Sequence, residues 1–260
     1  MAYENIILEK KEGIATITVN RPKVLNALND LTMRELDHAF RDANEDDAIG
    51  AVIFTGAGDR SFISGADISE LTLKTPVSGR DAIVFGQSVL NYMESMRKPV
   101  IAAISGFCLG GGMEMAMACH IRLASKTAKL GQPEVKLGLM PGFGGTQRLP
   151  RLAGKGWAME LILVGDMISA EEGMALGVIN HVYEPQELLP AAQKMARTII
   201  SRGPLAVRYC IEAINRGMNM PLQEGISYEA TMMGVILASE DKTEGTRAFL
   251  EKRTPKFTGK

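Results

Sequence analysis

The sequence has few of the residues from which metal centres and disulfide frameworks are built. Only three cysteines and three histidines occur in 260 residues, and there is no CxxC or HExxH pattern. An odd number of cysteines without such spacing suits reduced thiols in a reducing compartment. The histidines have no ligand spacing to one another or to a cysteine, so we expect no metal site. These residues are Cys108, Cys119, Cys210, His38, His120 and His181.

The sequence also has no excess charge of one sign. Lysine and arginine number 29 against 30 aspartate and glutamate, which gives a net charge of −1. This balance offers no electrostatic reason to expect nucleic acid or an anionic membrane as the main partner. No apolar run approaches the length of a membrane span, and residues 1–5 lack the pattern of a signal peptide. We therefore expect a soluble, cytoplasmic protein.

Hydrophobic residues make up 46% of the chain, enough for one large domain with a substantial core. Strand-like and helix-like segments alternate with short links before residue 155, which predicts an α/β fold with largely parallel strands. From residue 155 onward the pattern is mainly helical. We expect an α/β catalytic core over residues 1–200 and a helical C-terminal region over residues 201–260.

Several elements can be placed from hydrophobic periodicity, glycine and capping residues. The expected strands cover residues 5–9 and 13–20, as a hairpin, and then residues 50–56, 99–105 and 121–124. The expected helices cover residues 31–43, 80–96, 187–201, 204–216, 221–238 and 242–253, with a further capping-box start at Ser169.

Common nucleotide and hydrolase signatures are missing, because the chain has no GxGxxG fingerprint, no P-loop and no GxSxG elbow. It does have three successive glycines, residues 110–112, between an expected strand and an expected helix. Glycines there let the backbone approach a ligand, and the helix N-terminus adds positive potential. Such a turn can stabilise an oxyanion or bind phosphate, and it can equally be a tight structural turn.

Two glutamates follow glycine-containing turns directly. Glu114 leads into Met-Ala-Met-Ala, and Glu134 follows Gly-Gln-Pro. A carboxylate that enters an apolar interior has a raised pKa, which suits proton transfer near neutral pH. Each glutamate alone is better explained as an acidic residue in the first turn of a helix than as a catalytic group. If both face one cavity, they form an acid/base pair, and the loop with Asp67 could supply another inward N–H group.

These motifs, in this order, resemble the crotonase superfamily of enoyl-CoA hydratases and isomerases. The resemblance covers essentially the whole chain and includes both glutamates, as in the hydratases of the superfamily. The matching segments are NRPKVLNALN at residues 20–29, SFISGADI at 61–68, LGGGME at 109–114, GQPE at 131–134, PGFGGTQR at 141–148 and FLEKR at 249–253.

The resemblance implies a fold and an assembly. We expect a crotonase-like spiral of ββα turns, with a helical C-terminal region that builds trimers, usually stacked as hexamers. It also implies hydration of a trans-2-enoyl-CoA thioester to a 3-hydroxyacyl-CoA, the reaction of fatty acid β-oxidation. Coenzyme A would be part of the substrate, and no separate cofactor would be required.

By position in the motifs, the resemblance assigns roles to individual residues. Glu114 and Glu134 would be catalytic, and the backbone N–H groups of Ala66 and Gly111 would form the oxyanion hole. The remaining substrate contacts would come from Ala27, Ser64, Asp67, Ile68, Phe249 and Lys252, and the last two can reach in from a neighbouring subunit. Two positions depart from the usual pattern, since His120 replaces an acidic residue and Ser69 replaces a lysine.

Other functions remain open at this stage. Enoyl-CoA isomerisation, decarboxylation or dehalogenation is the nearest alternative, although isomerases typically need only the carboxylate at the position of Glu134. A different class is an RNA-binding protein, because some crotonase-like proteins bind RNA. The near-zero net charge argues against RNA, and salt-dependent retention on RNA would distinguish the two.

Overall fold

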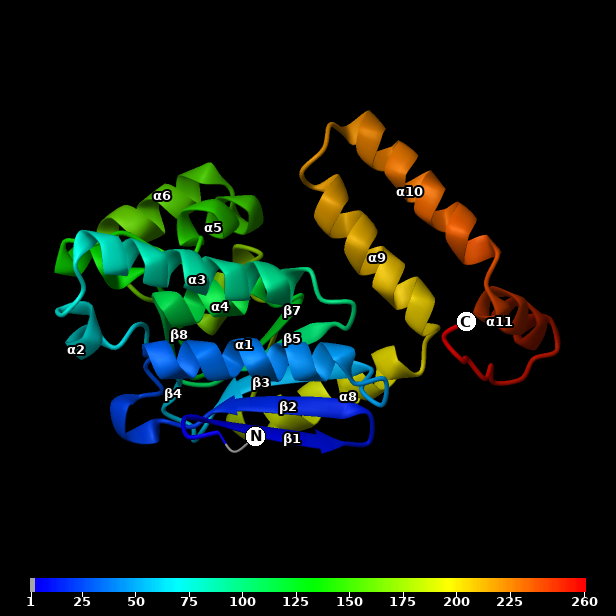
Figure 1. The fold of residues 1–260 in the computed structure, drawn as a ribbon, viewed down its shortest axis with the longest axis horizontal. Helices are drawn as coiled ribbons and strands as arrows, with labels where there is room; N and C mark the ends of the chain where they lie inside the picture. Colours follow the sequence, from blue (N-terminus) through cyan, green and yellow to red (C-terminus); the bar gives the residue numbers. More distant parts are fainter. Residues whose placement is uncertain (1–2) are drawn as a thin grey trace.

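The computed structural model describes residues 3–260, and its largest element is a six-stranded sheet in the order β1-β2-β3-β5-β7-β10 (Figure 1). Only β1 and β2 pair antiparallel, and the other strands run parallel. This confirms the predicted hairpin and the predicted parallel sheet. The strands are β1 (Ile6–Lys11), β2 (Ile14–Val19), β3 (Ala51–Gly56), β5 (Val100–Ile104), β7 (Ile121–Ser125) and β10 (His181–Tyr183).

A second sheet of four short strands has the order β4-β6-β8-β9. Its strands are β4 (Ser61–Ile63), β6 (Phe107–Leu109), β8 (Lys129–Gly131) and β9 (Ile168–Ser169). The first three follow β3, β5 and β7 in the chain and pair parallel with one another. Each turn of the chain therefore adds one strand to each sheet. This is the predicted spiral of ββα turns.

The sequence pattern did not predict β6. We expected the strand at residues 99–105 to lead directly into the glycine turn, but β6 lies between them. Gly106 has φ +58° at the junction, and a Cβ there would lie 2.1 Å from the Arg60 carbonyl oxygen. A three-residue strand is too short to show alternation, so only the tertiary pairing reveals it.

Helices cover both faces of the large sheet. The helices of the first 200 residues are α1 (Asp30–Glu45), α2 (Ile68–Leu71), α3 (Pro76–Glu94), α4 (Gly111–Ala118), α5 (Gly145–Ala153), α6 (Lys155–Val164), α7 (Ala170–Ala175) and α8 (Leu188–Ile200). Short 3₁₀ turns are η1 (Pro22–Val24), η2 (Pro133–Leu137) and η3 (Pro185–Glu187). Asn29 caps α1 by accepting from the Thr32 N–H, and the capping box predicted at Ser169 is confirmed by its hydrogen bonds with Glu172.

The core has two parts, one on each face of the large sheet. On one face α1, α3 and α4 pack against the strands through a cluster that includes Phe40, Phe54 and Phe62. On the other face α8 covers β3 and β5. Every residue of α4 is buried, so the helix is held rigidly between the small sheet and the neighbouring helices α3 and α5. This rigidity suits an element that carries a functional side chain.

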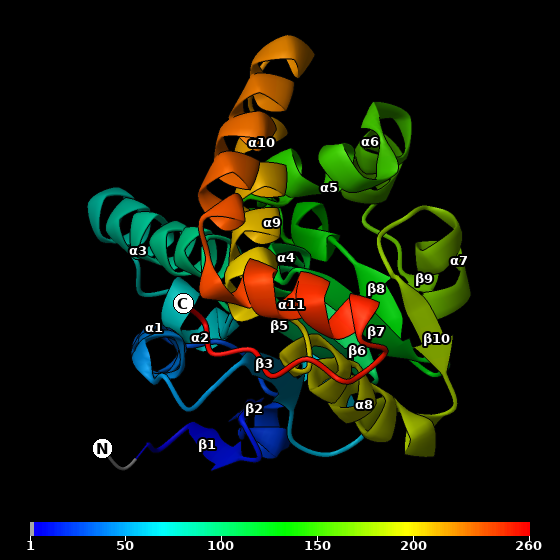
Figure 2. The same cartoon turned by 90° about the vertical axis from the view of Figure 1, so that its right-hand side faces the viewer.

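The C-terminal helices stand away from this core as an arm (Figures 1 and 2). They are α9 (Pro204–Gly217), α10 (Leu222–Leu237) and α11 (Glu240–Leu250). The predicted helical C-terminal region is confirmed, whereas a domain boundary at residue 200 stays a prediction. None of the helices in residues 3–260 is long and apolar enough to cross a membrane.

Candidate active site

A cleft of about 760 Å³ lies beside the N-terminus of α4. Its walls come from the start of α1, the loop at residues 64–68, α2, the first half of α3, the glycine turn, η2 and the loop at residues 139–143. A second hollow of about 640 Å³ lies between α11 and the C-terminal tail, and its lining contains neither Glu114 nor Glu134. The two predicted catalytic glutamates therefore lie together in the cleft at α4.

Glu114 lies in the first turn of α4 and is only 2% exposed. Its Oε1 accepts hydrogen bonds from the backbone N–H groups of Phe143, at 2.7 Å, and Gly145, at 2.6 Å. Burial and, less strongly, the charge of Glu134 together raise the pKa of this carboxyl to about 7, against the lowering effect of the Gly145 and Phe143 N–H groups. Glu114 can therefore gain or lose a proton near neutral pH.

The glycine turn determines how close α4 approaches its neighbours. Gly110 has φ +50°, a conformation that L side chains rarely adopt. A Cβ on Gly112 would lie 2.2 Å from the Ile63 carbonyl oxygen, so only glycine lets α4 pack against β4. The sequence motif thus has a structural role as well as the functional one that we expected.

Glu134 is the second residue of η2, immediately after Pro133, and is half-buried in the same cleft. Its Oε1 lies next to the glycine turn, since a Cβ on Gly110 would be 3.0 Å from it. Burial raises the pKa of this carboxyl too. When the buried Gln132 amide is assigned by its hydrogen bonding, its nitrogen donates to Glu134 Oε1 at 3.0 Å and to Oε2 at 3.2 Å.

The cleft also contains two backbone N–H groups that are available to a ligand. Within residues 3–260, the N–H groups of Ala66 and Gly111 make no backbone hydrogen bond outside regular secondary structure. Their neighbours are fixed, because the Leu28 N–H donates to the Gly65 carbonyl and the Asp67 N–H donates to the Leu28 carbonyl. Two such donors beside two carboxyl groups can stabilise a carbonyl oxygen that becomes negatively charged.

The predicted substrate-contact residues are distributed unevenly. Ser64, Asp67 and Ile68 line the cleft, whereas Ala27 does not, and its carbonyl oxygen accepts a hydrogen bond from Arg21. Arg21 also pairs with the Asp67 carboxylate at 3.1 Å, so it ties the two loops together. The Ser69 hydroxyl donates to Asp67, and the pKa of this carboxyl is lowered, chiefly by that hydrogen bond.

Phe249 and Lys252 lie far from the cleft of their own chain. Phe249 lies in the last turn of α11 and Lys252 just after it, whereas α2, whose residues line the cleft, lies at the opposite end of the molecule (Figure 1). The Phe249 side chain is 82% exposed. Any contact of these two residues with a ligand in the cleft would need a second copy of the chain, and their role stays a prediction.

The sequence did not indicate that Phe143 and Gly145 bind the Glu114 carboxylate. Their motif, at residues 141–148, marked the resemblance but received no role. The signal that was available is two glycines at the start of α5, because a helix N-terminus offers free N–H groups to a carboxylate. No group of three or more histidine, cysteine, aspartate or glutamate side chains in the described residues is arranged to hold a metal ion.

Comparisons with known proteins agree with this geometry. The sequence pattern of the family described as "Enoyl-CoA hydratase/isomerase" matches residues 9–260. A crotonyl-CoA hydratase of Syntrophomonas wolfei is 49% identical over 260 residues, which cover 100% of both chains. A short-chain-enoyl-CoA hydratase of Clostridium acetobutylicum is 46% identical over 253 residues, which cover 97% of both.

The fold has solved counterparts as well. The crystal structure of an enoyl-CoA hydratase from Bacillus anthracis superimposes with a TM-score of 0.96 at 38% sequence identity and covers 99% of this chain and all of the other. The match therefore includes the arm as well as the core. Sequence and structure together establish that the chain belongs to the enoyl-CoA hydratase/isomerase family, the crotonase superfamily.

Proposed function

We propose that the chain is an enoyl-CoA hydratase, which adds water reversibly to a trans-2-enoyl-CoA and gives a 3-hydroxyacyl-CoA. One observation carries the proposal. Two carboxyl groups with raised pKa values, Glu114 and Glu134, line the same cleft as the N–H groups of Ala66 and Gly111. The curated relatives with 46–49% identity carry names of this activity, which supports it.

In the proposed reaction, Glu114 orients a water molecule and takes its proton as the oxygen attacks the β-carbon. Water is a weak nucleophile, and a base with a pKa close to the working pH is the most effective aid to its attack. Glu134 delivers a proton to the α-carbon. Dehydration uses the same two groups with their roles exchanged. Both directions therefore require the pair to hold one proton in total.

The N–H groups of Ala66 and Gly111 would bind the thioester oxygen. Attack at the β-carbon moves negative charge onto that oxygen, and donors fixed in advance stabilise this charge without reorganisation. In other enzymes one such donor contributes roughly 10²–10³ in rate. Every step moves only protons and the elements of water, so the proposed reaction needs no cofactor beyond the coenzyme A of the substrate.

The rest of the thioester would lie along the loops that Arg21 ties together. Ser64, Asp67 and Ile68 border the cleft there, and the Ala27 carbonyl oxygen accepts a hydrogen bond from Arg21. Phe249 and Lys252 of a neighbouring copy would contact the nucleotide end. This arrangement requires association of the chain, as trimers or as hexamers made of two trimers.

A test with two substrates separates hydration from isomerisation. The purified protein is mixed, without any cofactor, with crotonyl-CoA or with its β,γ-unsaturated isomer, vinylacetyl-CoA. We expect rapid loss of the conjugated enoyl-thioester absorbance with the first and formation of 3-hydroxybutyryl-CoA. Conversion of vinylacetyl-CoA to crotonyl-CoA without subsequent hydration would instead identify an isomerase.

A further inference from the structure

The loop at residues 142–145 is held from two sides at once. On one side its N–H groups, from Phe143 and Gly145, donate to Glu114. On the other side its carbonyl oxygens accept from side chains of two helices. Gln87 Nε2 of α3 donates to the Gly142 carbonyl at 2.8 Å, and Arg148 Nη1 of α5 donates to the Phe143 carbonyl at 2.9 Å. The peptide unit between Gly142 and Phe143 therefore connects Gln87 directly to the carboxylate. The Phe143 carbonyl that Arg148 holds belongs to the next peptide unit, which lies between the two N–H donors.

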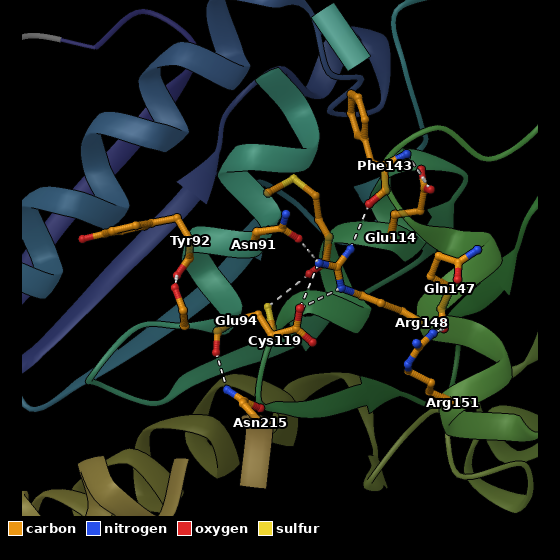
Figure 3. Close-up of polar contacts among 12 residues, drawn as sticks. Asn91, Tyr92, Glu94, Glu114, Cys119, Phe143, Gln147, Arg148, Arg151 and Asn215 are labelled. Carbon is orange, nitrogen blue, oxygen red and sulfur yellow. Dashed lines mark hydrogen bonds and ion pairs between the residues drawn. The ribbon is translucent and has the colours of Figure 1, made fainter. Parts of the chain in front are cut away.

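Arg148 is itself fixed by partners on α3, as Figure 3 shows. Its Nε and Nη2 donate to Glu94 Oε2 at 3.2 and 2.9 Å, and Nη2 also donates to Asn91 Oδ1 at 2.8 Å. The arginine side chain is only 12% exposed. A guanidinium group presents several N–H donors in one rigid plane, so it can engage all three partners together.

Two glycines make this approach possible. Gly144 has φ +102°, and a Cβ on it would lie 2.5 Å from Arg148 Nη1. A Cβ on Gly145 would lie 3.0 Å from Glu114 Oε1. The pair therefore leaves room for the guanidinium on one side of the loop and for the carboxylate on the other. Any larger residue would force apart the groups that the loop joins.

We propose that Arg148 is a positioning residue of the active site, which holds the Phe143 carbonyl so that the N–H groups of Phe143 and Gly145 keep the Glu114 carboxylate aimed into the cleft. The inference rests on the proposed hydratase function, because it assumes that Glu114 is the base. It gives a role to the motif at residues 141–148 that the catalytic assignment leaves unused.

The charges around Glu114 and Arg148 predict a second effect of replacing the arginine, a change in the pKa of Glu114, which can be measured separately. Glu114 is influenced by the carboxylate of Glu134 on η2, which raises its pKa, and by Arg148 on α5, which lowers it. Glu94 on α3 pairs with Arg148 on the side away from Glu114. Loss of the arginine charge therefore raises the pKa of Glu114, whereas a lysine at the same position keeps a positive charge but cannot make all the hydrogen bonds.

Three variants distinguish the positioning role of Arg148 from the effect of its positive charge. Arg148→Gln removes both the positive charge and the planar set of guanidinium N–H donors, and Arg148→Lys removes only that set of donors. Arg151→Gln is the matched control, because Arg151 lies on the same helix, is exposed and, among residues 3–260, donates only to the Gln147 carbonyl (Figure 3). For each protein we would measure kcat and KM for crotonyl-CoA, the pH profile of kcat/KM, and the amide hydrogen exchange of Phe143 and Gly145.

We expect both Arg148 variants to lose about 10- to 100-fold in kcat, the scale of a small misplacement of a catalytic group, with KM changed less than about threefold. Amide exchange at Phe143 and Gly145 should be faster in both. The pH profile should move to higher pH in Arg148→Gln and stay near that of the unmodified protein in Arg148→Lys. Arg151→Gln should change none of these quantities.

Unchanged kcat and unchanged exchange in Arg148→Gln would overturn the proposal, as would a loss confined to KM. If Arg148→Gln does not fold, Glu94→Gln replaces it, since this change frees one side of the guanidinium and should lower kcat and speed the exchange to a smaller extent. If the unmodified protein does not hydrate crotonyl-CoA, the proposed function fails. The exchange data still decide whether Arg148 holds the loop.

Discussion

At the scale of single residues, the site depends on the Glu114 carboxylate. Burial disfavours its charged form, and backbone N–H groups stabilise it. Glu114 lies in the first turn of α4 and at the N-terminus of α5, whose first N–H, from Gly145, it accepts. Two helix N-termini and two N–H groups favour its charge. Burial still dominates, and the pKa stays raised at about 7. The result is a base that is stable in the fold and still able to take up a proton.

The raised pKa values predict the pH dependence of activity. The pair is active when it holds one proton, so kcat/KM should be bell-shaped, with limbs that belong to the coupled pair and not to either residue alone. Because burial raises both pKa values, activity should fall on acidification well before the ordinary glutamate pKa of about 4.3 is reached. A profile in crotonyl-CoA that stays flat down to pH 4.5 would show that the two glutamates are not the titrating groups.

The sequence predicted these two residues because each follows a local signal, a glycine turn or Gly-Gln-Pro. It did not predict the partners of Glu114, because Phe143 and Gly145 act through backbone N–H groups and lie 29 and 31 positions away. Almost every residue type has a backbone N–H group, so the sequence does not show which of these groups donates to a carboxylate. Arg148 was missed for a related reason, since its role depends on helices α3 and α5 lying side by side.

At the scale of elements, the strands and helices with strong periodicity were predicted, whereas the second sheet was not. Its strands have two or three residues, and β4, β6 and β8 follow closely after longer strands, so no hydrophobic pattern marks them. Yet this sheet positions the site, because β6 and β8 lead into the turns that carry Glu114 and Glu134. Only the pairing of distant segments defines it.

The packing of α3 on the loop at residues 142–145 gives a test at this scale. A Cβ on Gly86 would lie 2.3 Å from the ring of Phe143. Gly86→Ala should therefore displace the ring and its loop, lower kcat severalfold and destabilise the protein by about 1–3 kcal/mol, the usual cost of overpacking.

The matched control is Gly156→Ala, because Gly156 is also helical and a Cβ there meets nothing within 4 Å. This change should stabilise the protein by about 0.5–1 kcal/mol through the helix propensity of alanine. Thermal unfolding and steady-state kinetics of both variants check the pair. Equal stability and equal kcat in the two would contradict the packing argument.

At the scale of the whole molecule, the arm has no core of its own. Neither α9 nor α10 contains a buried residue. Apolar side chains on them and at the C-cap of α9 are largely exposed, namely Ile214, Met218, Leu222, Ile226, Met233, Val235 and Leu237. An exposed apolar surface of this kind is typical of an interface with another chain. It fits the trimer that the resemblance implies, in which α11 of one copy would approach the cleft of another.

Ile226→Glu tests this association, because it places a charge on the exposed apolar surface of α10, where Ile226 is 51% exposed. We expect the variant to sediment as single chains of 28.1 kDa at concentrations where the unmodified protein sediments as trimers or larger assemblies. The KM for the coenzyme A thioester should rise, because Phe249 and Lys252 of the neighbour are lost. Gln223→Glu, on an exposed polar position of the same helix, is the control. An unmodified protein that sediments as a monomer would contradict the account of the arm.

The central claim is that Glu114 and Glu134 together hydrate an enoyl thioester, and the most direct measurement compares Glu114→Gln and Glu134→Gln with the unmodified protein. General acid–base groups typically contribute about 10²–10⁴ in rate, so each variant should lose at least about 10² in kcat for crotonyl-CoA. Thioester binding should change little, because glutamine has nearly the same size. Turnover close to that of the unmodified protein in both variants would contradict the account.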